Sequence, residues 1–318
     1  MRKLSLLLLV LLLAFTTACG QTKEESASEG GKTTLKIGYL PITHAGPLYM
    51  EAHVHDEQFE GQDVEMVKFG SWPDLMDALN TGRIDGASVL VELAMMAKEQ
   101  GIDLKAVALG HKDGNVLVTS NDIQETADLE GATYAIPHKF SSHNILLNEM
   151  LKKDGMTYED VNVVEMAPAE MPAALSENRI AGYVVAEPFG AQAVVLDKGK
   201  VHYHSEEIWP ESYCCVLVLR NDTIQKDGET VQAFVDQYVK GGELANQKDD
   251  AVYESFGEFM KVDKEVLELS LEWISYDDLR IEESEYDKLS GFMVEMGLTE
   301  NPPAYEEFVD NTFIDKVK

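Results

Sequence analysis

The stretch Ile136–Pro188 decides how the chain is organised, and it contains the segment Ser141-Ser142-His143-Asn144. A strand-like run, Ala132–Ile136, ends at Pro137, and after a short polar loop a helical pattern opens on the two serines. Farther along, a second apolar run ends in Ala186-Glu187-Pro188. Points where a strand stops and a helix begins gather at one edge of an open α/β sheet, where ligands bind. Because the N–H groups and hydroxyls of helix starts suit polar molecules, this pattern predicts a binder of small solutes.

The N-terminal residues have the pattern of an export signal. Arg2 and Lys3 precede an apolar run, Leu4–Ala14, which has signal-peptide length and is too short to span a membrane. The segment Thr16-Thr17-Ala18-Cys19 resembles the site at which bacterial lipoproteins are cleaved and lipidated, although threonine replaces the usual leucine. We therefore predict a signal peptide over 1–18, lipidation of Cys19, and a flexible linker over 19–34. An ordinary secretory signal with an incidental cysteine is the alternative.

Charge narrows the class of partner. The chain carries 57 Asp and Glu against 26 Lys and Arg, a formal net charge of −31. This charge excludes a nucleic-acid partner held through phosphate contacts. It also sets up a field that repels anions, which salt screens beyond about 8–10 Å. An acidic surface that keeps an exported protein soluble is the simpler explanation of the same charge.

Strand and helix patterns alternate along the first third of the chain. Leu35–Leu40 and Val64–Phe69 predict strands. Pro47 opens a helix that runs to about Gln58, and Ser71 is expected to cap a second helix that stops near Gly82. Further strands are predicted at Ile84–Leu90, Leu104–Leu109 and Asn115–Thr119. Such alternation is typical of α/β proteins with a largely parallel sheet covered by helices.

An internal similarity indicates two related lobes. Residues 78–89 (ALNTGRIDGASV) and 174–185 (ALSENRIAGYVV) share six of twelve positions at an offset of 96, which also pairs Pro41 with Pro137. We assign 35–117 and 218–318 to a first lobe and 118–217 to a second. Two strands, Val116–Thr119 and Val216–Leu219, are expected to cross between them as a hinge. The helical tail from about Thr223 is expected to pack on the first lobe.

A group of motifs along residues 35–220 carries a family resemblance. They are Leu40-Pro41-Ile42-Thr43-His44-Ala45-Gly46-Pro47-Leu48-Tyr49, Gly70-Ser71-Trp72, Ile136-Pro137-His138, Ser142-His143-Asn144, Ala186-Glu187-Pro188-Phe189 and Glu207-Ile208-Trp209-Pro210. In order and spacing the chain resembles the nitrate/sulfonate/bicarbonate (NitT/TauT) class of ABC-importer substrate-binding lipoproteins. The resemblance implies a two-lobed, type II periplasmic-binding-protein fold. It also implies delivery of a solute to a membrane permease with a separate cytoplasmic ATPase, and the chain has no Gly-Lys-Ser/Thr phosphate loop of its own.

The same resemblance implies particular ligand-binding residues. The nitrate and bicarbonate binders of the class hold their ligand with a tryptophan, a histidine, a glutamate and a lysine. By motif, the first three fall on Trp72, in a loop that forms a cleft wall, on His143 and on Glu187. The lysine position falls on Cys215, and this departure argues against nitrate and bicarbonate.

Five more residues are candidates from their positions alone. Ser141 and Ser142 are expected to cap a helix, and one of them to face the ligand. Thr43 and His44 occupy the matching loop of the first lobe, and Asn115 opens a crossing strand.

Cysteine use is sparse, since Cys214 and Cys215 are the only cysteines besides Cys19. Neighbouring residues rarely form a disulfide, because their Cα atoms lie closer than the usual bridging range. Two thiols in one strand point to opposite faces. We therefore expect two free thiols, one facing the cleft and the other the core.

The favoured function is an extracytoplasmic, lipid-anchored, monomeric receptor that captures a small polar solute between its lobes. Sulfonate-like or oxyanion-like solutes and small heterocycles fit this class, and no enzyme activity, catalytic residue or cofactor is expected. Micromolar binding requires about −8 kcal/mol, whereas the best tiny ligands reach about −1.5 kcal/mol per heavy atom. Nitrate, with four atoms, falls short of this unless a cation pairs with it.

Two alternatives remain open at the level of sequence. Thiamin-pyrimidine synthases of the same fold use histidines and a cysteine-rich motif, of which Cys214-Cys215 is a fragment. A cluster of His44, His143, Glu187 and a thiol could instead hold a soft divalent metal ion.

Overall fold

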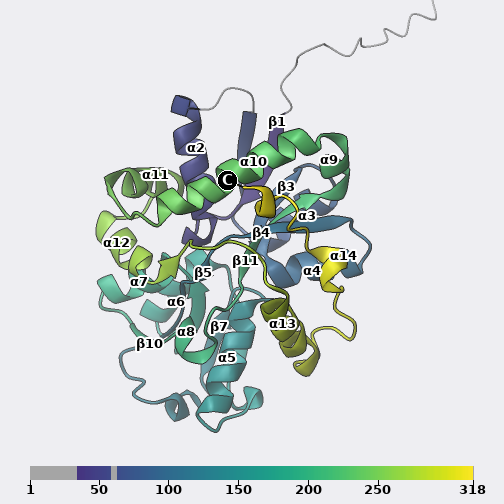
Figure 1. Ribbon diagram of the computed structural model, residues 1–318. Helices are drawn as coiled ribbons and strands as arrows, with labels where there is room; N and C mark the ends of the chain where they lie inside the picture. Colours follow the sequence, from purple (N-terminus) through teal and green to yellow (C-terminus); the bar gives the residue numbers. More distant parts are fainter. Residues whose placement is uncertain (1–33, 59–62, 318) are drawn as a thin grey trace, which may run out of the picture. The chain divides into compact units, whose positions relative to one another are not determined.

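Two five-stranded sheets organise the chain (Figure 1). The computed structural model describes residues 34–58 and 63–317, so the predicted signal peptide, Cys19 and the linker up to residue 33 lie outside the described residues. The first sheet has the strand order β2-β1-β3-β11-β4. Its strands are β1 (Thr34–Tyr39), β2 (Asp63–Lys68), β3 (Gly86–Leu90), β4 (Leu104–Leu109) and β11 (Cys215–Arg220). β1 is parallel to β2 and β3, whereas β11 is antiparallel to β3 and β4.

The second sheet repeats this arrangement with the order β10-β6-β9-β7-β8. Its strands are β6 (Asn115–Thr119), β7 (Thr133–Ile136), β8 (Asn162–Glu165), β9 (Gly182–Ala186) and β10 (Lys200–His204). β7 is parallel to β8 and β9, and β6 is antiparallel to β9 and β10. Each sheet therefore has three parallel strands, one antiparallel crossing strand and one further strand beyond it. The prediction of two similar lobes is confirmed.

The internal repeat aligns Gly86 with Gly182, and the structure explains why both positions hold glycine. A Cβ on Gly86 would lie 2.6 Å from the carbonyl oxygen of Val218 in the crossing strand β11. A Cβ on Gly182 would lie 2.5 Å from the carbonyl oxygen of Val118 in the crossing strand β6. The same close approach of a crossing strand excludes a side chain at both positions.

Helices cover both sheets. Those that follow strands of the first sheet are α2 (Gly46–Gln58), α3 (Trp72–Asn80) and α4 (Val91–Glu99). Those that follow strands of the second are α5 (Ser142–Lys153), α6 (Met171–Ser176), α7 (Phe189–Val195) and α8 (Ser205–Ile208). Short 3₁₀ helices lie at η1 (Thr43–Ala45), η2 (Thr126–Leu129), η3 (Tyr158–Asp160), η4 (Pro168–Glu170) and η5 (Ile314–Lys316). Ser71 caps α3 as predicted, because its side chain accepts a hydrogen bond from the N–H of Asp74.

The C-terminal third is helical, as expected. It contains α9 (Asn221–Lys226), α10 (Gly228–Ala245), α11 (Asp250–Met260), α12 (Lys264–Glu272), α13 (Glu283–Glu295) and α14 (Tyr305–Phe308). α10 packs along α2 of the first lobe (Figure 1), so closely that a Cβ on Gly241 would clash with the carbonyl oxygen of Pro47. α12 also packs against α7, so the tail contacts the second lobe as well. A two-residue ladder joins β12 (Ile274–Ser275) to β5 (Lys112–Asp113) beside the first crossing.

The crossing strands β6 and β11 do not themselves span both sheets, because the chain changes sheet just before each of them begins. All of β6 belongs to the second sheet and all of β11 to the first, so the chain passes between sheets before Asn115 and before Cys215. The lobe division at 117/118 and 217/218 stays a prediction. Among the described residues, no helix combines the length and the hydropathy required to cross a bilayer.

Candidate functional site

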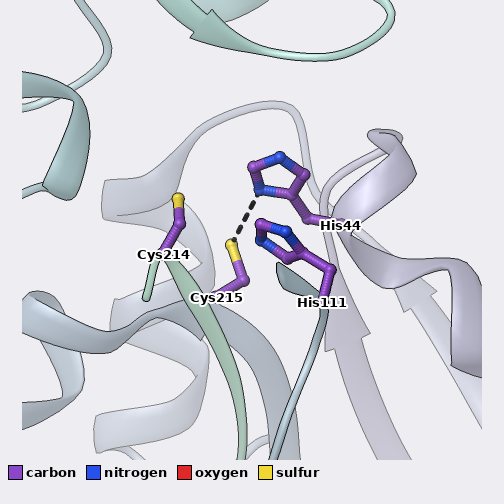
Figure 2. A group of neighbouring side chains, drawn as sticks. All are labelled: His44, His111, Cys214 and Cys215. Atoms are coloured by element: carbon purple, nitrogen blue, oxygen red, sulfur yellow. Dashed lines mark hydrogen bonds between the residues drawn. The ribbon is translucent and has the colours of Figure 1, made fainter. Parts of the chain in front are cut away.

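Four buried side chains converge where the first sheet meets the crossing segments. They belong to His44, His111, Cys214 and Cys215, and each offers one nitrogen or sulfur atom within 4.8 Å of the others (Figure 2). His44 lies in η1 after β1, and His111 follows β4 across Gly110. The cysteines stand at the start of β11, which runs antiparallel to β4. The carboxyl ends of β1 and β4 and the amino end of β11 therefore bring residues far apart in sequence to one edge.

The two cysteines point to the same side, so the expectation that they face opposite sides is wrong. Both are free thiols, as expected, and both are fully buried. The alternation of side chains holds within a strand, but β11 begins only at Cys215. Cys214 lies in the irregular segment before it, which turns its sulfur towards the same cluster.

Backbone carbonyls fix which nitrogen of each histidine is free. His44 Nε2 lies 3.3 Å from the carbonyl oxygen of Gly114, and His111 Nδ1 lies 2.8 Å from that of Asp113. A carbonyl oxygen only accepts, so each of these nitrogens carries the proton and donates. The other nitrogens, His44 Nδ1 and His111 Nε2, then hold lone pairs. His111 Nε2 is buried with no hydrogen-bond partner.

Electrostatics favour neutral imidazole beside one thiolate. Burial and the neighbouring His111 lower the pKa of His44 to about 4, so its ring is neutral at physiological pH. Burial opposes ionisation of Cys214, but the hydrogen bond with Cys215 and the nearby imidazole of His143 outweigh it and hold the thiol pKa well below its usual value. Burial, and then the adjacent Cys214, raise the pKa of the Cys215 thiol.

One ligand pair has the spacing expected in a metal site with nitrogen and sulfur ligands. Bond lengths of about 2.0–2.1 Å for Zn–N and 2.3 Å for Zn–S place the two ligand atoms of a tetrahedral site about 3.6 Å apart. His44 Nδ1 and Cys215 Sγ are 3.5 Å apart. The N–H···O=C contacts of both histidines are also the outer contacts that metal-bound histidines usually make, because they fix the ring and the tautomer.

Residues of the second lobe close over this cluster. The His143 ring at the start of α5 is nearly parallel to the His44 ring, with centroids 6.3 Å apart, and His143 Nε2 lies 4.0 Å from Cys214 Sγ. The adjacent Ser142 contacts the Glu92 carboxyl of α4 and the carbonyl oxygen of Tyr213. His143, Ser142 and Glu92 are all buried.

Glu187 and Thr43 form a second junction between the lobes. The backbone carbonyl of Glu187 accepts hydrogen bonds from the N–H and hydroxyl of Thr43, at 2.8 and 3.3 Å. Its carboxyl Oε2 accepts from the N–H of Ala191 and lies 3.0 Å from the hydroxyl oxygen of Ser270 on α12, which itself donates to the carbonyl oxygen of Val266. Burial raises the pKa of Glu187 to about 8 despite these hydrogen bonds. Glu187 is therefore tied to helices on both sides of the junction.

The remaining predicted site residues contribute no atom to this group of four ligands. Trp72 was expected in a loop, but it is the first residue of α3 and packs in the apolar core with Nε1 unpartnered. Ser141 caps α5 by accepting from the N–H of Asn144. Asn115 opens β6 opposite Ala186, and both polar atoms of its side chain are buried without partners.

Three residues of this region were not among the predicted ligand-binding residues: His111, Cys214 and Glu92. A usable signal existed for His111, because it follows a predicted strand at the edge to which His44 also belongs. Glu92 is the second residue of α4, where acidic residues are common in any helix. Only its burial distinguishes it from such residues, and burial is not visible in the sequence.

Two sheets of the same strand order, joined by two crossings, define the class of two-lobed periplasmic binding proteins. Solved structures agree: the periplasmic aliphatic sulphonate binding protein of Escherichia coli superposes with a TM-score of 0.72 over 89% of this chain and 100% of that one, at 18% identity. The chain belongs to the NMT1-like family, whose sequence model matches residues 28–254.

Several similar proteins are components of import systems. The ligand binding component of an ABC-type import system from Staphylococcus aureus, solved with zinc bound, is 42% identical, with a TM-score of 0.85 over 90% of this chain and 99% of that one. The nitrate/nitrite binding protein of Nostoc sp. PCC 7120 is 25% identical over 227 residues, 64% of this chain and 52% of that protein. The chain spans about a third to a half of the length of the first curated relatives it matches. These relatives include substrate-binding proteins for nitrate and sulfonates.

Proposed function

We propose that this chain is the extracytoplasmic receptor of an ABC importer and that its site takes a soft divalent metal ion, Zn²⁺ first of all. The observation that carries the proposal is the convergence of four buried nitrogen and sulfur ligands, His44, His111, Cys214 and Cys215. Two imidazoles and two thiolates are a common ligand set of tetrahedral zinc. Oxygen-preferring ions such as Mg²⁺ and Ca²⁺ are disfavoured by the same set. Zinc in the similar Staphylococcus aureus protein supports this assignment.

Charge also supports a cation. Two deprotonated thiols carry two negative charges, which Zn²⁺ neutralises inside a buried site. In the part of the chain that the structure describes, no lysine or arginine side chain is buried. An anion such as nitrate would therefore enter a site without a buried lysine or arginine, beside the Cys214 thiol, whose pKa its neighbours hold well below the usual value.

A small polar solute is the second candidate. One observation favours it: the Asn115 amide oxygen and nitrogen are both buried without partners, and buried polar groups are normally hydrogen-bonded. A solute that supplied both a donor and an acceptor would satisfy them. Mass spectrometry of whatever co-purifies with the native protein separates this candidate from a metal alone.

The cellular setting completes the proposal. Lipid on Cys19 would hold the receptor at the outer face of the membrane, next to a permease served by a separate ATPase. The chain acts as a monomer and without enzyme activity. Cys19→Ala should move the protein from the membrane fraction to the soluble fraction, and retention of the variant in the membrane fraction would refute the anchor.

Metal binding is tested on protein purified without a His-tag, stripped with a chelator and then titrated with Zn²⁺. We expect one Zn²⁺ per chain by elemental analysis, and a rise in stability of about 4 kcal/mol when free Zn²⁺ is a thousandfold above Kd. Cys214→Ser and His111→Ala should abolish stoichiometric binding. His202→Ala is the matched control, because His202 lies on β10 and contacts Thr126. Stripped wild-type protein that binds no Zn²⁺ would overturn the assignment.

A further inference from the structure

Three oxygen atoms form a short chain beside the cysteines. Ser142 Oγ lies 2.6 Å from Glu92 Oε1 and 2.5 Å from the backbone carbonyl oxygen of Tyr213. Glu92 belongs to α4 and thus to the first lobe, whereas Ser142 is the first residue of α5 in the second. Tyr213 directly precedes Cys214 in the segment that bears both thiols. The chain of oxygens therefore joins both lobes to the metal-binding segment.

Counting protons assigns the donor in each contact. Ser142 has one hydroxyl proton, and the carbonyl of Tyr213 only accepts. For both contacts to be hydrogen bonds, Ser142 must donate to Tyr213 and Glu92 must donate to Ser142. Glu92 then carries a proton, as a neutral carboxylic acid. An ionised carboxylate would leave two acceptors competing for one hydroxyl proton.

The surroundings of Glu92 agree with a neutral acid. Its side chain is fully buried and Oε2 has no hydrogen-bond partner. A buried charge without a pairing group is strongly unfavourable, so such a group takes up a proton instead. Burial, and then the nearby Cys214, raise the pKa of Glu92 well above its usual value.

We propose that neutral Glu92 and Ser142 form a latch that holds the start of α5 over the cysteines and so sets the rate at which metal leaves. This rests on the proposed function, because it describes release of the same metal. His143 follows Ser142 and is held with Nε2 4.0 Å from Cys214 Sγ, so opening the latch also withdraws that ring. The four ligands themselves are fully buried, so part of the fold must move before metal leaves, and the latch assigns that movement to α5. Ser142 and Glu92 act as positioning residues, because their hydrogen bonds are made to each other and to Tyr213 and not to a metal ligand atom.

The test measures Zn²⁺ dissociation from loaded, full-length protein into excess chelator. Ser142→Ala and Glu92→Leu should each speed release about tenfold or more, and the double variant should be no faster than the faster single one, since both break the same chain. Glu92→Gln should release at the wild-type rate within about twofold, because its amide N–H replaces the acid proton. Ser255→Ala is the matched control: this buried serine donates to the carbonyl oxygen of Tyr49 away from the site. Unchanged release from Ser142→Ala and Glu92→Leu would overturn the latch.

Two measurements without metal keep the latch testable by itself. The infrared difference between wild type and Glu92→Gln should contain the C=O stretch of a protonated carboxylic acid, and its absence would refute the proton assignment. Amide hydrogen exchange in the first turn of α5 should quicken in Ser142→Ala and not in Ser255→Ala. If wild type binds no Zn²⁺, the proposed function fails while these two results still decide whether the latch exists.

Discussion

Glu187 gives the sharpest prediction about stability, because it is a buried acid held between the lobes. Burial raises its pKa from an ordinary value of 4.5 to about 8. The folded protein therefore binds a proton at pH values where the unfolded chain has lost it. By linkage, stability from this group is fully present below about pH 4.5 and is lost as the pH rises towards about 8, where the folded state also ionises.

The size of the effect follows from the shift in pKa. Each unit corresponds to 1.36 kcal/mol, so a shift of about three and a half units gives at most about 5 kcal/mol. Between roughly pH 5 and pH 9, wild type should lose about 4 kcal/mol of unfolding free energy that Glu187→Gln retains. The amide side chain of this variant keeps an oxygen to accept from the N–H of Ala191 and cannot ionise. The variant should therefore be the less pH-sensitive protein.

The assay is denaturant unfolding of wild type, Glu187→Gln and the exposed control Glu258→Gln at a series of pH values. Other buried acids contribute equally to all three proteins, so the difference between curves isolates Glu187. The curve of Glu258→Gln should run parallel to wild type. Wild-type and Glu187→Gln curves that run parallel across the alkaline range would refute the reasoning, since they would mean that Glu187 ionises normally in the folded state.

Three further predictions concern the site and its supports. Gly110→Ala should weaken Zn²⁺ binding at least tenfold by titration, because its Cβ would lie 2.7 Å from the carbonyl oxygen of His44, which cannot move without displacing that ligand. Tyr276→Phe should destabilise the protein by about 1 kcal/mol in chemical unfolding, since its hydroxyl donates to the carbonyl oxygen of Thr43 in a buried position. Zn²⁺ binding should release at least one proton, measured by calorimetry in buffers of different ionisation enthalpy, and affinity should rise with pH, because Cys215 enters as a thiol of raised pKa and must bind as a thiolate. Normal affinity in Gly110→Ala, unchanged stability of Tyr276→Phe, or buffer-independent heats would contradict the respective arguments.

Most of the fold could be predicted from local sequence patterns. β4 and β6 have the predicted bounds, and α2 begins one residue before Pro47. These elements are set by apolar periodicity and by caps, which act over a few residues. The internal repeat indicated the lobes, and Gly86 and Gly182 explain it, because a neighbouring crossing strand leaves room for no side chain at either position.

The candidate site was only partly predictable, since its ligands come from three separate segments. His44 was a candidate from its place in the chain and Cys215 from the family resemblance, whereas His111 was missed although it follows a predicted strand at the same edge. The period of two placed the cysteines on opposite faces, and it failed because Cys214 lies outside β11. Glu92 is buried in contact with Ser142 of α5, which lies 50 residues away in sequence, and no local pattern predicts such a contact.

Two features of the chain favour a cation as cargo: the net negative charge, which acts at a distance, and the buried ligand atoms, which act in contact. A net charge of −31 raises the concentration of cations near the surface and lowers that of anions, within a distance that salt limits to about 10 Å. This field cannot select among cations, because it acts on charge alone. Selection is left to the buried atoms, where two sulfur and two nitrogen ligands prefer a soft ion over Mg²⁺ or Ca²⁺. Capture of metal should therefore slow with added salt, whereas release from the closed site, governed by Glu92 and Ser142, should not. A release rate that rises with ionic strength as steeply as the capture rate falls would show that surface charge, and not the latch, retains the metal.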